Sequence, residues 1–235
     1  MNIKKIYNDW SVKLLNNKYS KEIVAGVGFV VVVGGGAYLY RMYVNNREDA
    51  AIRAFSDCLD ETAKALNLDY GMAENKKDQK DVWDDLEMAY SAGVDQHSSS
   101  KLAGYFKIYQ AGALSKEGKQ EEAIALMKQA VKEIPSASLL KPLYQNKYAL
   151  MMMDSKDESV QKEGLSLLES LANDSTNQNA DLSLYFLGLY YWSKNDLSAV
   201  KNVWGKLVKD FSSEDKNKDS AWAQLAKERL DSIQA

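Results

Sequence analysis

The sequence predicts an all-α protein in which one transmembrane helix near the N-terminus precedes a solenoid of helical hairpins. Three observations support this fold class. A long uncharged run lies early in the chain, the remainder is rich in strong helix formers with only two prolines in 235 residues, and its apolar residues recur in helical pairs. The predicted domains are a short cytoplasmic amphipathic segment (1–20), a transmembrane helix (21–44), linking helices (45–98) and degenerate hairpin repeats that end in a capping helix (99–235).

The transmembrane prediction rests on residues 23–40, which carry no charge over eighteen positions. As a helix this run would be about 27 Å long, which is close to the thickness of a thin bilayer core. The run contains five glycines. Glycine lowers helix stability in water but is common in membrane helices, so a buried soluble helix is the weaker interpretation.

The charges that flank this run predict its orientation. Lysines outnumber acidic residues on the N-terminal side, whereas arginines are mixed with acidic residues on the other side. The positive excess places the N-terminus in the cytoplasm and the rest of the chain across the membrane. Tyr38, Tyr40 and Tyr43 are typical of an aromatic belt at the far interface.

A cleaved signal peptide is the alternative to an anchor. Residues 23–33 could form its apolar core, and Gly35, Gly36 and Ala37 could form a cleavage site of small residues. The long segment before the run and the apolar character after the cleavage site both favour an anchor. Cleavage at Ala37 would instead release a secreted soluble scaffold.

Two further features of the N-terminal region predict contacts. Small residues recur at helical spacing and could pack against a partner's membrane helix; they are Ala25, Gly28, Val32 and Gly35. Before the run, apolar residues fall on one side of a basic helix, namely Ile3, Ile6, Tyr7, Trp10, Leu14 and Leu15. Such a helix can lie on an anionic membrane surface or bind in a partner's groove.

The chain after the run is predicted to be helical throughout. No helix breaker separates the run from the apolar stripe that follows it, so the membrane helix is expected to continue as one long helix. A polar stretch near residue 70 ends that helix, and an acidic helix follows around residues 81–90.

The hairpin prediction is clearest in residues 100–135. One helix ends near Lys116, a short turn follows, and a second helix runs to Pro135. Each second helix carries residues spaced four and three apart that allow it to cross its partner closely. These triplets are Ala123, Met127 and Ala130, then Gly164, Leu168 and Leu171, then Val200, Trp204 and Leu207. A last amphipathic helix from about residue 221 would cover the end of the array.

The first positions of these triplets are 41 and 36 residues apart (123 to 164, and 164 to 200). Helix pairs that recur near 34 residues resemble tetratricopeptide repeats. The first pair matches that pattern at Ala111, Ala123, Ala130 and Pro135, and the third pair matches it at Gly188, Tyr191, Asn195 and Asp196. The middle pair contains the insertion DSKDESVQKE and lacks the closing proline.

The order of these elements, together with the third pair LYFLGLYYWSKNDLSAVKNVWGKLV, resembles the YfgM-like family of bacterial inner-membrane proteins over nearly the full chain. The resemblance implies a cytoplasmic N-terminus, one membrane helix and a periplasmic tetratricopeptide-like domain. It also implies that the chain is an ancillary subunit of the Sec translocon and associates with periplasmic chaperones. The expected partners are therefore translocon subunits, chaperones or emerging chains. The chain itself is expected to be embedded in the membrane.

The composition favours protein binding over catalysis. The net charge of -3 argues against nucleic acid as a partner, and a single histidine, His97, with a single cysteine, Cys58, offers no zinc ligand set. No cofactor, metal or small-molecule substrate is expected, and no enzyme activity. The alternative function is a structural subunit of another envelope complex.

The predicted partner-binding groove is lined by the first helix of each pair. Its candidate residues are Tyr105, Ile108, Leu143, Asn146, Tyr185, Leu189 and Trp192. Tyrosine and tryptophan are common where one end of a side chain is buried and the other meets a partner. Each of these residues could alternatively belong to the core.

Overall fold

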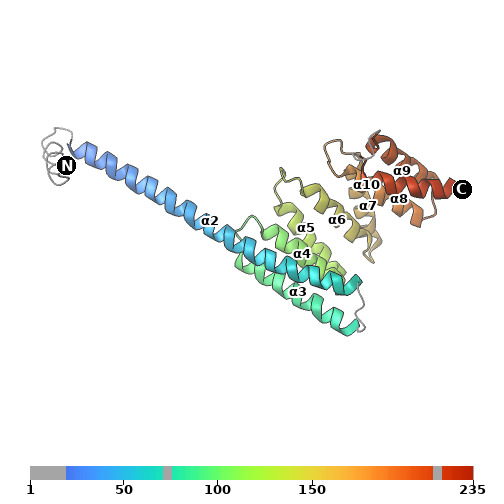
Figure 1. The fold of residues 1–235 in the computed structure, drawn as a ribbon, viewed down its shortest axis with the longest axis horizontal. Helices are drawn as coiled ribbons and strands as arrows, with labels where there is room; N and C mark the ends of the chain where they lie inside the picture. Colours follow the sequence, from blue (N-terminus) through green and yellow to red (C-terminus); the bar gives the residue numbers. More distant parts are fainter. Residues whose placement is uncertain (1–19, 71–75, 214–218, 235) are drawn as a thin grey trace. The chain divides into compact units, whose positions relative to one another are not determined.

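The computed structural model describes residues 20–70, 76–213 and 219–234, with the side chains of 35–67, 81–213 and 219–233. These residues form helices and turns with no strand among them, which confirms the all-α prediction (Figure 1). The helices are α2 (Ser20–Tyr70), α3 (Lys76–Gln96), α4 (Ala103–Lys116), α5 (Gln120–Glu133), α6 (Lys141–Met153), α7 (Glu158–Asn173), α8 (Ala180–Ser193), α9 (Leu197–Phe211) and α10 (Ala221–Gln234).

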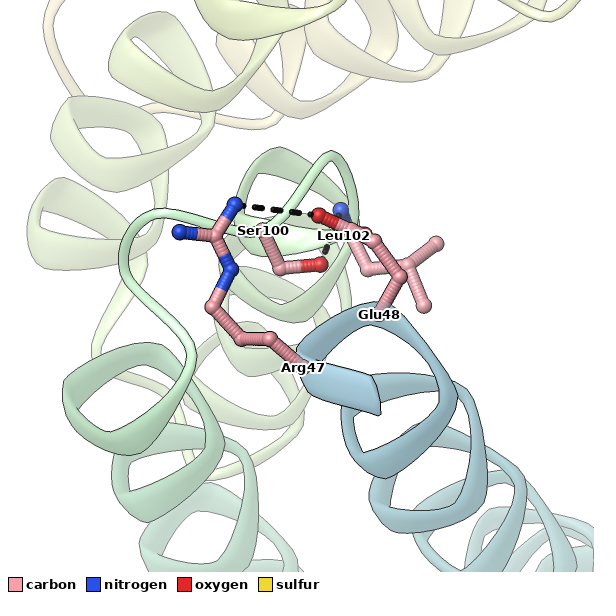
Figure 2. Close-up of polar contacts among 4 residues, drawn as sticks. All are labelled: Arg47, Glu48, Ser100 and Leu102. Atoms are coloured by element: carbon pink, nitrogen blue, oxygen red, sulfur yellow. Dashed lines mark hydrogen bonds and ion pairs between the residues drawn. The ribbon is translucent and has the colours of Figure 1, made fainter. Parts of the chain in front are cut away.

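The chain forms two compact units that divide between Ala50 and Ala51, within α2. As predicted, α2 runs without a break from the apolar run and ends at Tyr70. In the first unit Tyr38, Tyr40 and Tyr43 are exposed, and Arg47 Nη2 lies 3.4 Å from Glu48 Oε1 (Figure 2). Within the described part of the chain, no helix combines the length and the apolar character needed to cross a membrane.

Several predicted contacts of the N-terminal region lie outside the described residues. These are residues 1–19 of the amphipathic segment 1–20 and the side chains of Ala25, Gly28 and Val32. Gly35 is described: it is exposed, and a Cβ added to it would meet no atom within 4 Å. The small-residue packing face therefore stays a prediction.

The second unit begins with the α2 residues that follow Ala50, which pack on α3 and α4. Phe55 of α2 meets Phe106 of α4 edge to face, with ring centroids 5.0 Å apart. Thr62 of α2 shares a 2.6 Å hydrogen bond with the buried Tyr90 of α3. An aromatic cluster therefore joins the predicted linking helices to the first hairpin.

Three hairpins follow, formed by α4 with α5, α6 with α7, and α8 with α9, and α10 packs on the last of them. The central residues of the predicted triplets, Met127, Leu168 and Trp204, are each 0% exposed. The other residues of the triplets are buried as well. The spacing in the sequence thus identified the buried face of each second helix.

The hairpin turns differ in how they are closed. Gly118 (φ 85°) lies between α4 and α5, and Asn195 (φ 58°) lies between α8 and α9. Glycine and asparagine are the residues that adopt this left-handed conformation most readily. In the turn between α6 and α7, the buried Ser155 donates its backbone N–H to Met152 O, and Gln161 Nε2 donates to Ser155 O at 2.6 Å.

The third hairpin has the closest crossing. The indole ring of Trp204 on α9 lies directly on Gly188 of α8, and its Nε1 donates a 3.1 Å hydrogen bond to Tyr185 O. A Cβ added to Gly188 would lie 2.0 Å from Trp204 Nε1. Glycine is therefore needed here to admit the large ring that the triplet places opposite it.

The second and third hairpins share a buried polar contact. Ser183 Oγ of α8 donates to Asn146 Oδ1 of α6 at 2.7 Å, and both residues are 0% exposed. Asn146 Nδ2 in turn donates to Pro142 O at 3.0 Å. Because the buried amide is satisfied on both sides, it fixes how α6 lies against α8.

Candidate functional site

An open groove of about 690 Å³ lies between α6, α7 and α8. Five of its lining side chains are apolar: Leu150 and Met153 of α6, and Phe186, Leu189 and Tyr190 of α8. All five are partly exposed, so apolar surface remains in contact with solvent. A concave, partly apolar surface of this volume suits the side chains of a bound peptide. We call this cavity the α6–α8 groove.

Charged side chains also line the α6–α8 groove. Asp154 and Glu158 lie at the turn between α6 and α7, Lys162 lies one turn along α7, and Lys194 follows the end of α8. All four are exposed, and none forms an ion pair within the described part of the chain. A partner could therefore meet charges of both signs at the rim of this groove.

The turn between α6 and α7 contributes Asp154 to the groove lining, and Glu158 follows it at the start of α7. Asp157 caps α7 by accepting a 2.8 Å hydrogen bond from the backbone N–H of Ser159, and it also accepts one from the Ser159 hydroxyl at 2.7 Å. These bonds hold the pKa of Asp157 below its usual value. The cap fixes the start of α7, from which Glu158, Gln161 and Lys162 project to the groove.

Of the seven predicted groove residues, Leu189 lines the α6–α8 groove. Ile108 and Asn146 are 0% exposed and Tyr185 is 5% exposed, so in this conformation these three are core side chains. Leu143 is exposed on α6, outside the groove lining.

The two remaining predicted aromatic residues are partly buried against neighbouring helices. Tyr105 packs on Tyr144 with ring centroids 5.8 Å apart, and its hydroxyl lies 3.3 Å from Ser138 Oγ. Trp192 is covered by α10, where Arg229 Cζ lies 5.0 Å from its ring centroid. The C-terminal helix therefore occupies part of the surface that the sequence assigned to a partner.

Among the apolar residues of the groove, sequence reasoning missed Leu150, Met153, Phe186 and Tyr190. Phe186 lies three positions before Leu189, and residues three apart share a helix face, so helical spacing could have identified it. Leu150 and Met153 belong to the run ALMMM, where neighbouring apolar residues leave the exposed face undefined.

The isolated reactive residues lie away from the groove. Burial raises the pKa of the Cys58 thiol, which belongs to α2. The His97 ring stacks on Phe106 at 5.8 Å between centroids. In the same turn Ser100 Oγ accepts a hydrogen bond of 3.1 Å from the backbone N–H of Leu102, as a local cap (Figure 2). Among the described residues, no group of three or more His, Cys, Asp or Glu side chains is arranged to hold a metal ion.

Comparison of the chain with known protein-family models finds no match, and comparison with curated proteins finds none either.

Proposed function

We propose that this chain is a non-enzymatic, membrane-anchored adaptor whose helical-hairpin domain binds other proteins through the α6–α8 groove. The observation that carries the proposal is the groove itself, which exposes five apolar side chains together with four charged side chains that form no ion pair in the described part of the chain. Protein-binding grooves combine these two features, because apolar contact supplies affinity while charges select the partner.

The anchor in this proposal is the transmembrane helix of residues 21–44, with the N-terminus in the cytoplasm of a bacterium and the hairpin domain in the periplasm. The uncharged run of residues 23–40 and the lysines before it support this topology. The hairpin array is tetratricopeptide-like, supported by three helix pairs with buried triplets at matching positions. We further propose the Sec translocon as the site of action, with periplasmic chaperones or emerging chains as partners of the groove.

Site-specific photo-cross-linking in bacterial cells tests the proposal. A photo-reactive amino acid at Lys194, on the rim of the α6–α8 groove, should cross-link translocon subunits, chaperones or emerging chains. The same amino acid at Lys201, which is exposed on the second helix of that hairpin, should not. Equal cross-linking from both positions would argue against the groove as the binding surface.

The alternative functions give different results when the tagged chain is extracted in mild detergent. A fixed set of other membrane proteins in constant stoichiometry would indicate a structural subunit of another envelope complex. Mass spectrometry of the N-terminus tests the anchor, because a new N-terminus at Tyr38 would mean cleavage after Ala37 and a secreted scaffold.

A further inference from the structure

Lys147 extends the face of α6 that forms one wall of the α6–α8 groove. It precedes Leu150 by three positions and Asp154 by seven, and both of these residues line the groove. Residues at this spacing lie on one side of a helix, about 5 Å apart per turn. A peptide in the groove that continues along α6 would therefore reach Lys147 next.

The ammonium group of Lys147 lies in an aromatic environment between α6 and α4. Its Nζ is 5.6 Å from the centroid of the Tyr109 ring, and it approaches α4 where Gly112 has no side chain, since a Cβ there would be 3.4 Å from Nζ. Tyr144 precedes Lys147 by three positions, so it lies on the same side of α6. Loss of hydration in this environment lowers the pKa of Lys147.

No carboxylate in the described part of the chain forms an ion pair with Lys147, although the side chain is accessible to solvent. A partly desolvated cation without a counter-charge is unfavourable, and the Tyr109 ring compensates it only in part. A carboxylate brought by a partner would restore the lost interaction through a charge-assisted hydrogen bond.

We propose that Lys147 forms a subsite for an acidic side chain, so that the groove selects partner segments in which a glutamate or aspartate accompanies apolar residues. Apolar side chains of the partner lie over Leu150 and Leu189, and its carboxylate accepts a hydrogen bond from Lys147 Nζ. This inference rests on the proposed function, because it assigns a partner chemistry to the same groove.

The experiment measures fluorescence anisotropy of labelled peptides with the full chain in mild detergent. The two probes are a peptide of Leu-Glu-Ala repeats and its Leu-Gln-Ala counterpart, which differ only in charge. The glutamate peptide should bind the wild type about tenfold more tightly, as expected for a hydrogen bond to a charged group. Lys147→Met keeps the aliphatic stem and should abolish this preference, whereas Lys147→Arg should retain most of it.

Lys128→Met is the matched control, because Lys128 is exposed on α5 and outside the groove lining. It should leave the glutamate preference unchanged. In addition, the pKa of Lys147 measured by NMR should rise when the glutamate peptide binds and stay constant with the glutamine peptide. If Lys147 had only a structural role, its replacement by methionine would leave the glutamate preference unchanged, and the glutamate peptide would not change the pKa of Lys147.

Two results would overturn the inference. If Lys147→Met still preferred the glutamate peptide, Lys147 would not be the subsite. The groove would nevertheless remain a peptide-binding surface, because both peptides would still bind to it. Failure of both peptides to bind the wild type would also overturn it. The cross-links from Lys194 would then decide separately whether the groove has another kind of protein partner.

Discussion

Gly188→Ala should destabilise the third hairpin strongly. The added methyl group would lie 2.0 Å from Trp204 Nε1 and 2.4 Å from Cδ1, so the indole ring must move. Trp204 is 0% exposed, stacks on Tyr185 at 6.0 Å and meets Trp192 edge to face at 5.3 Å, so it has little room. Movement would also break its hydrogen bond to Tyr185 O.

The expected magnitude follows from three contributions. Overpacking in a core typically costs about 1–3 kcal/mol, and a buried indole N–H without an acceptor costs a further amount of about 1–3 kcal/mol. Replacing glycine by alanine within a helix stabilises the folded state by about 1 kcal/mol, because alanine has the higher helix propensity. The net loss in the free energy of unfolding should therefore be about 1–5 kcal/mol.

Urea denaturation followed by circular dichroism measures this loss. Gly205→Ala is the matched control, because Gly205 lies within α9 and an added Cβ there would meet no atom within 4 Å. That variant should be as stable as the wild type or more stable by up to about 1 kcal/mol. A Gly188→Ala variant within about 0.5 kcal/mol of the wild type, or equal losses in both variants, would refute the reasoning.

Three further changes have expected outcomes. Ser183→Ala leaves the buried Asn146 Oδ1 without its donor and should lower the free energy of unfolding by about 1–3 kcal/mol. Burial raises the pKa of Tyr90, so the folded state holds this proton more tightly than the unfolded chain does. The free energy of unfolding in urea should therefore fall above about pH 10, where the unfolded chain loses the proton first. In Tyr90→Phe this fall should be less steep. Arg229→Met removes the cation over the Trp192 ring and should cost about 0.5–2 kcal/mol in the same urea assay.

Exposed positions supply the controls for these changes. Ser198→Ala on α9 and Lys227→Met on α10 alter exposed side chains and should change stability by less than about 0.5 kcal/mol. Losses in these variants as large as those at Ser183 and Arg229 would contradict the assignments. A Tyr90→Phe variant with an unchanged alkaline slope would remove Tyr90 as the group responsible.

The fold was largely predictable because its second helices are amphipathic. Met127, Leu168 and Trp204 recur at equivalent positions, and helical spacing then places their neighbours on the same buried face. The turn at Gly118 was predictable for a local reason, since the glycine permits the backbone conformation that the turn requires.

The site was less predictable because the first helices are not amphipathic. In α8, the sequence LSLYFLGLYYW is apolar at almost every position, so periodicity cannot separate the buried Tyr185 from the partly exposed Leu189. The groove also depends on how the second hairpin lies against the third. That arrangement is fixed by contacts between distant residues such as Asn146 and Ser183, which no local pattern reveals.

Among the residues that the structure describes, the hydrophobic core forms three successive clusters: one between α2, α3 and α4, one between α4, α5 and α6, and one from α6 to α10. Each cluster draws on helices that are neighbours in the chain. Such local contacts form quickly and need little loop closure. The cluster of the first hairpin can therefore close before the last helices have been synthesised, so the chain is suited to folding from its N-terminal end as it is produced.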